Sequence, residues 1–209
     1  MRKAFLLMFS LLFSFLSFSQ QQTVLKITRS YFRSDPFEGK FSSFVTHLLN
    51  DPTLSGKMLE KRTDTSLFYF QGTYNSFNPF FFKPKRVQVV LTELPVDLDS
   101  LERDTIYNYQ LFAYDDDTKE GVQAVKKEFD KIFRHFKGSF NSNQHSVNPA
   151  GSSSNGETYN FFDALHGVAP FAISWFGPTK DKEMCLVLTI RLDNRYNQAI
   201  LPVPFYTPK

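Results

Sequence analysis

An amphipathic pattern over residues 117–137 is the feature that most constrains the fold of this chain. Its apolar side chains recur every three or four residues and so share one face of a predicted helix: Val122, Val125, Phe129, Ile132, Phe133 and Phe136. Asp117 and Glu120 fit a capping box at the start of this helix. The opposite face is basic, with Lys126, Lys127, Lys131, Arg134 and Lys137. A helix with a single apolar face has to pack against a second layer of structure.

The other apolar segments predict one more long helix and a series of strands. The helix is expected over residues 35–50, where Asp35 and Glu38 fit a capping box and Pro36 suits the first turn. A shorter helix is expected over 161–166. Segments rich in β-branched and aromatic residues predict strands over 23–32, 67–74, 85–94, 105–114, 171–176, 184–192 and 198–203.

The expected fold class is α+β. Strands joined by short turns favour antiparallel pairing, and two amphipathic helices suffice to cover one face of a sheet. We therefore expect a mostly antiparallel β-sheet with two main helices packed on one face, in two layers. A curved sheet wrapped by helices, as in cystatin-like or NTF2-like folds, is one form of this architecture, and that analogy carries no function.

Residues 1–19 predict a cleaved secretory signal. The basic Arg2 and Lys3 precede an apolar and Ser run over 4–18, and Ser17 and Ser19 are small residues at the positions that a signal peptidase reads. The run is shorter than the roughly 20 residues of a membrane-spanning helix. We therefore expect a secreted or periplasmic protein with no transmembrane segment in its mature chain.

The remaining chain, residues 20–209, is expected to form a single domain. Within it, the Ser-, Asn- and Gly-rich segment 139–157 is expected to be a flexible loop, and loops of this length are usually functional or mobile. Ser100 and Thr105 each stand in an Asp–Ser/Thr–apolar tripeptide, the acceptor that some bacteria O-glycosylate in exported proteins. Three-residue patterns of this kind also arise by chance.

The charge composition excludes nucleic acid as a partner. The mature chain has 22 basic residues (24 less Arg2 and Lys3) against 21 acidic ones, so it has no overall field that would attract nucleic acid.

The chain contains 25 Phe, which is enough to build a core. Its one cysteine, Cys185, can form no intramolecular disulfide, and its apolar neighbours predict a small buried hydrophobic side chain.

Common catalytic and cofactor motifs are absent from the sequence. The four His residues show no metal-binding spacing, and no Gly-rich phosphate-binding or dinucleotide-binding motif occurs. The Asp run at 115–117 lacks the Asp or Asn that a calcium loop needs at position 119. The Ser-rich segment 151–156 lacks the second Gly of a nucleophile elbow. The sequence therefore indicates no metal and no cofactor.

The aromatic and basic segment 68–86 is the first candidate binding surface. Strand side chains alternate between two faces, so rings on both faces cannot all fit one core. Rings left exposed there would form a patch suited to an apolar ligand, a membrane or a protein. The candidate binding residues are Tyr74, Phe77, Phe80, Phe81, Phe82, Lys83, Lys85 and Arg86. The basic face of residues 117–137 is a second candidate, for an anionic lipid or polysaccharide.

The leading expectation is a non-enzymatic, exported binding or interaction module of the cell envelope, whose partner is an envelope protein, a lipid or a glycan. A hydrolase of envelope or extracellular material is the alternative. It would use Glu157, Asp163 and His166, which lie at and beyond the end of the 139–157 segment. A third hypothesis is an assembly partner in which that segment becomes ordered on binding.

Overall fold

The computed structural model describes residues 22–61, 67–94, 106–140, 142–147, 155–162, 169–193 and 198–199. In this part of the chain nine strands form one antiparallel sheet, with the order β1-β2-β3-β4-β8-β7-β6-β5 and with β9 paired to β8 beside this path. The strands are β1 (Leu54–Glu60), β2 (Tyr69–Tyr74), β3 (Arg86–Leu94), β4 (Ile106–Asp116), β5 (Ser142–Val147), β6 (Asn155–Phe162), β7 (Phe171–Gly177), β8 (Glu183–Asp193) and β9 (Gln198–Ala199).

The β4–β8 pair lies at the centre of the sheet. Its register runs from Ile106 opposite Asp193 to Asp116 opposite Glu183. Four strands precede the longest helix and the later strands return from the opposite edge, so the two halves of the chain meet at this pair. Side chains that alternate along it, such as Leu111 and Leu188, are fully buried on the face that the helices cover.

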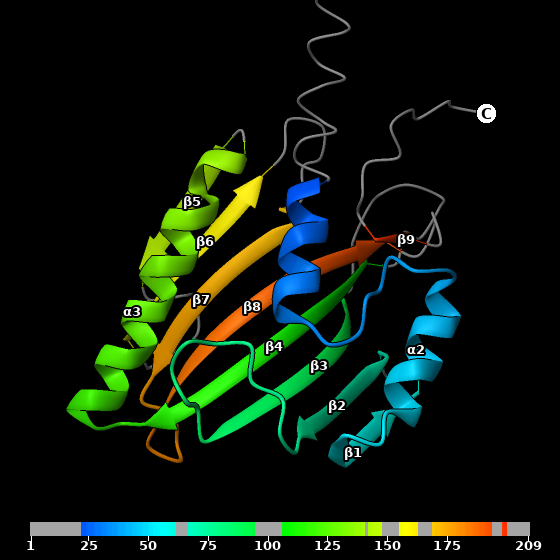
Figure 1. Cartoon of the computed structure of the whole chain (residues 1–209), viewed down its shortest axis with the longest axis horizontal. Helices are drawn as coiled ribbons and strands as arrows, with labels where there is room; N and C mark the ends of the chain where they lie inside the picture. Colours follow the sequence, from blue (N-terminus) through cyan, green and yellow to red (C-terminus); the bar gives the residue numbers. More distant parts are fainter. Residues whose placement is uncertain are drawn as a thin grey trace, which may run out of the picture.

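Three helices pack on that face: residues 22–31, α2 (Phe41–Asn50) and α3 (Lys119–Phe136), which is followed by a 3-10 turn at Lys137–Ser139. Figure 1 shows them in front of the strands, with the 22–31 helix (blue) between α3 and α2. α3 packs against β4, β7 and β8, and its Phe133 ring stacks on Tyr159 of β6. The predicted α+β class with an antiparallel sheet is confirmed, and the described residues contain three helices on this face where two were expected.

The predicted apolar stripe of α3 faces the sheet. Val125, Phe129, Ile132 and Phe136 are buried, and Val122 and Phe133 pack against the same core. The start of the helix differs from the prediction. Thr118 is the N-cap, and its side-chain oxygen accepts a hydrogen bond from the Gly121 N–H at 3.1 Å, so Asp117 lies one residue before the cap.

The strand predicted over residues 23–32 is wrong, because residues 22–31 are helical. The segment is rich in β-branched residues, which favour strands by local propensity. Within the helix, however, the buried side chains are Val24, Ile27 and Thr28, with Tyr31 half-buried, and this spacing of three, four and seven residues places them on one helix face. Burial of that face against the sheet outweighs the local preference.

The helix predicted over 35–50 begins only at Phe41. Asp35 does not cap it. Its carboxylate accepts the Phe37 N–H at 2.9 Å, in a turn, and pairs with Arg29 at 3.0 Å. Gly39 then adopts a positive φ of 79°, which ends the turn and prevents a continuous helix from Asp35.

Two strands lie where a flexible loop was predicted. β5 falls inside the 139–157 segment and β6 begins within it, and residues 161 and 162 belong to β6 rather than to the predicted 161–166 helix. β5 lacks an apolar signal because it is a polar edge strand that pairs with β6 alone in the sheet order. The first half of β6, residues 155–158, has no apolar side chain, and Thr158 there makes a side-chain hydrogen bond of 2.9 Å to Ser174 on β7. β1 was also missed, since Leu54 is its one buried residue.

Several predictions concern residues outside the described part of the chain. They are the signal at 1–19, the acceptor residues Ser100 and Thr105, residues 141 and 148–154 of the expected loop, residues 163–166 of the expected short helix, and residues 200–203 of the expected last strand. None of the helices in the described ranges is long and apolar enough to cross a membrane.

Candidate functional site

The aromatic residues of segment 68–86 take different positions in the structure. Tyr74 and Phe80 are buried members of the core, and Phe77 and Phe82 are partly buried against it. Phe81 alone among these rings is strongly exposed, with 83% of its surface accessible. The segment therefore supplies core residues and one protruding ring.

Asn78 sets the direction of these rings. Its side-chain oxygen accepts the Phe80 N–H at 2.9 Å, and its side-chain amide donates to the Phe82 carbonyl at 2.9 Å. One amide thus holds both ends of a tight turn, which keeps Phe80 over the core and leaves Phe81 at its tip.

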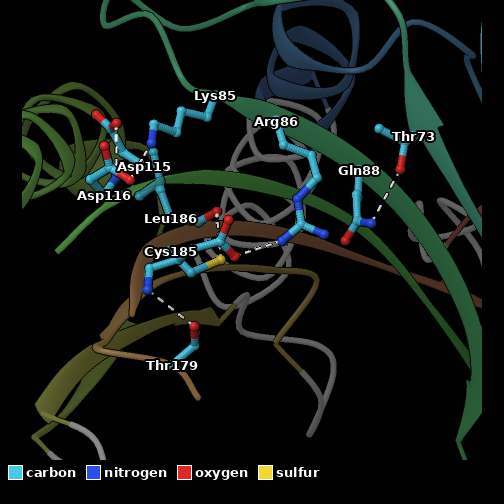
Figure 2. A network of polar contacts seen from close by, with 10 residues as sticks. Thr73, Lys85, Arg86, Gln88, Asp115, Asp116, Thr179, Cys185 and Leu186 are labelled. Atoms are coloured by element: carbon cyan, nitrogen blue, oxygen red, sulfur yellow. Dashed lines mark hydrogen bonds and ion pairs between the residues drawn. The ribbon is translucent and has the colours of Figure 1, made fainter. Parts of the chain in front are cut away.

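The two cations at the end of this segment are neutralised within the sheet. The Lys85 ammonium pairs with Asp116, and this hydrogen bond raises the pKa of Lys85. The Arg86 guanidinium donates to Glu183 at 2.6 Å and lies 4.0 Å from the centre of the Tyr114 ring. Figure 2 shows both residues within one network of polar contacts among β3, β4 and β8. Lys85 and Arg86 therefore stabilise the sheet and are not free cations of a binding surface.

An open groove lies along the exposed side of α3. It has a volume of about 1000 Å³ and is lined by Tyr31, Phe81, Gln123, Lys126, Lys127, Asp130, Lys131, Arg134 and His135. A second hollow of about 500 Å³ shares Phe81, Gln123, Lys127 and Lys131 with it and adds Phe82, Glu120, Ala124 and Glu128. In Figure 1 the β2–β3 connection that carries Phe81 rises over the same face of the sheet as α3 and the 22–31 helix.

The larger groove carries an excess of positive charge. Four cationic side chains line it, against the single carboxylate of Asp130. Asp130 lies close enough to the Tyr159 phenol on β6 to contribute to its raised pKa, after burial and Glu157. Within the described part of the chain, Lys127 and Arg134 have no ion-pair partner within 4.0 Å.

Lys126 and Lys131 contact aromatic rings. The Lys126 ammonium lies 4.3 Å from the centre of the Trp175 ring, and the Lys131 ammonium lies over the ring of Phe81. The Trp175 ring is buried on β7 beneath α3, so Lys126 covers it from the groove side. Lys131 thus links the helix to the tip of the β2–β3 connection.

Glu128 lies beneath this contact and is 4% exposed. Burial raises the pKa of its carboxyl group, and the charge of Lys131 and a hydrogen bond from the Phe81 backbone offset part of that shift. One of its oxygens is 3.9 Å from the Lys131 ammonium. Burial, with a smaller contribution from Glu128, also raises the pKa of Tyr31 to about 12. Glu128 thereby fastens the Phe81 turn to α3.

The catalytic alternative is represented in the described residues by Glu157 alone, since Asp163 and His166 lie outside them. Glu157 on β6 is 3.3 Å from the His145 ring nitrogen on β5, and that ring stacks on Tyr159 with 4.3 Å between centres. Cys185 is buried as expected, and burial raises the pKa of its thiol. No group of three or more potential metal ligands occurs in the ranges that the structure describes.

The sequence predicted a basic face on α3 and an aromatic surface over residues 68–86, but not that the two meet at one groove. The basic face of α3 was one candidate surface, and Phe81 was one of eight candidate binding residues on the other. Tyr31 was missed because it fell in a wrongly predicted strand, and Glu128 because a buried carboxylate gives no local signal. Comparisons with protein-family models, with curated proteins and with solved structures return no match for this chain.

Proposed function

We propose that this protein is an exported, non-enzymatic binding module of the cell envelope, and that it holds an anionic ligand in the α3 groove. One observation carries the proposal: the structure brings four cations of one helix face and the exposed Phe81 ring together around one open groove. The basic and apolar residues 1–19 support export to the periplasm or the exterior.

The charge arrangement explains why the ligand should be anionic. Lys127 and Arg134 form no ion pair within 4.0 Å with any described residue, so an anion gains attraction without first breaking an ion pair. Phe81 adds an apolar contact beside them, which favours a ligand with both a charged and an apolar part. The charge is local, because the chain as a whole is close to neutral.

Fluorescence of Trp175 tests this proposal directly. It is the single tryptophan of the chain, and the Lys126 ammonium of the groove lies against its ring. The probes are heparin, polyphosphate and vesicles that contain phosphatidylglycerol, with neutral dextran as the control. We expect a saturable change of emission with at least one anionic probe and none with dextran.

A pair of matched variants locates the effect. Lys127→Gln with Arg134→Gln removes two unpaired groove charges and keeps good helix formers, so it should weaken binding several-fold without loss of structure. Lys40→Gln with Lys180→Gln removes two exposed charges that do not line the groove and should leave binding unchanged. Failure of every anionic probe, or equal losses in both variants, would contradict the proposal.

The hydrolase alternative has weaker support. Glu157 and His145 do form a close pair at 3.3 Å, but neither side chain lines the groove of α3. A binding module is therefore the function that the geometry of the described residues favours.

A further inference from the structure

We infer that the α3 groove docks this protein on an anionic lipid bilayer, with Phe81 entering the interfacial region between headgroups and acyl chains. The inference rests on the proposed function and names the class of its ligand. Three features of the described residues carry it: the position of the Phe81 ring, the contact of that ring with Lys131, and the row of cations along α3.

The Phe81 ring protrudes from the protein surface. It is 83% exposed at the tip of the turn that Asn78 holds, and it lines both hollows. The next cation in the chain, Lys83, is also exposed. A single large apolar side chain surrounded by cations is suited to an anionic membrane surface, where the ring leaves water and the cations meet the headgroups.

The contact with Lys131 places a cation directly against the apolar ring. The Lys131 ammonium lies over the ring of Phe81, which is still 83% exposed. A bilayer surface suits such a pair, because the ring can leave water while the ammonium meets a headgroup.

The cations of α3 form a row suited to a flat surface. Lys126 and Arg134 are separated by eight residues of helix, about 12 Å at the α-helical rise, and Lys127 and Lys131 lie between them on the exposed side. Such a row can meet several lipid headgroups at once without fixed geometry at any one of them. The carboxylate of Asp130, the one acidic group lining the larger groove, is near Tyr159.

Co-sedimentation with vesicles tests the inference on the full mature chain. Vesicles of phosphatidylglycerol in phosphatidylcholine are compared with vesicles of phosphatidylcholine alone, and we expect binding to the anionic vesicles only. Phe81→Ser should weaken this binding about tenfold through the lost apolar contact. Lys127→Gln with Arg134→Gln should weaken it about 25-fold, at roughly fivefold for each charge.

Two controls show that these losses are specific. Val147→Ser removes another exposed apolar side chain, on β5, and Lys40→Gln with Lys180→Gln removes two charges outside the groove. Both should bind anionic vesicles as the unchanged protein does. Equal losses in the controls and the groove variants would overturn the inference.

The depth of residue 81 gives a second readout. In the Phe81→Trp variant, lipids brominated on the acyl chain should quench the added fluorescence, while the buried Trp175 of the unchanged protein should not be quenched. Vesicle binding without quenching at residue 81 would overturn insertion of the ring. Binding to heparin or polyphosphate without binding to vesicles would overturn the bilayer as ligand and leave the proposed function standing. Binding to none of these probes would overturn both.

Discussion

Phe80 and Phe81 are neighbours in the chain and have opposite environments. Phe80 is 6% exposed and packs near the rings of Tyr31 and Phe82, whereas Phe81 points away from the core. The difference arises from the two hydrogen bonds of Asn78, which fix the turn between them. Composition shows a run of rings, and the turn decides which of them remains available to a ligand.

These two residues should differ sharply in their effect on stability. Phe80→Ala is expected to lower the free energy of unfolding by about 3 kcal/mol, because it leaves a cavity beneath the turn. Phe81→Ala should change it by no more than about 0.5 kcal/mol, because the ring is exposed. Urea unfolding followed by circular dichroism measures both, and a similar loss in the two variants would show that Phe81 belongs to the core.

α3 combines a structural and a functional face. Its apolar stripe covers the centre of the sheet, and its cations line the groove. The first turn is fixed by Gly121, whose N–H donates to Thr118 and whose Cα lies close to the chain before the helix. A side chain at Gly121 would place its Cβ 2.2 Å from the Asp116 carbonyl oxygen, which is backbone and cannot move aside easily.

Gly121→Ala should therefore destabilise the protein, although Ala normally favours a helix by about 1 kcal/mol over Gly. We expect a loss of about 2 kcal/mol in the free energy of unfolding, from the displaced backbone before α3. Gly138→Ala is the matched control, since a Cβ there meets no atom within 4 Å and should be nearly neutral. Thermal and urea unfolding of the pair measure the difference, and a Gly121→Ala protein as stable as the control would contradict this account of the helix start.

The elements that sequence predicted well are those with a strong apolar period. β3, β4, β7, β8 and α3 bury alternating or helically spaced side chains, and their bounds lie within a few residues of the predictions. β1 and β5 are edge strands, so each pairs on one side only and buries few side chains. Their sequences therefore show little of the apolar alternation that predicts a strand. The 22–31 helix was misassigned because its β-branched residues favour a strand until the sheet beneath it is known.

At the scale of the whole molecule, the groove depends on the topology of the sheet. Phe81 precedes β3, while the cations lie on α3 between β4 and β5. Both reach the same face because the β2–β3 connection and all three described helices pack on one side of the strands (Figure 1). Local patterns predicted the basic face of α3 and included Phe81 among the candidate binding residues, and only the order of the strands could show that the two meet.

Lys85 and Arg86 have a different role from the cations of α3. In the network of Figure 2, Arg86 on β3 pairs with Glu183 on β8, and Lys85, just before β3, pairs with Asp116 on β4. A ligand drawn to this network would have to break ion pairs that already exist. We therefore predict that an anionic ligand occupies the α3 side and leaves the Arg86 side unchanged.

Hydrogen–deuterium exchange of the mature protein, with and without vesicles that contain phosphatidylglycerol, tests this claim most directly. We predict slower exchange of the backbone amides in residues 75–84, at the turn that carries Phe81, and unchanged exchange in the 177–183 turn beside Arg86. Protection of the 177–183 turn without protection of residues 75–84 would place the ligand on the other side of the sheet and contradict the account.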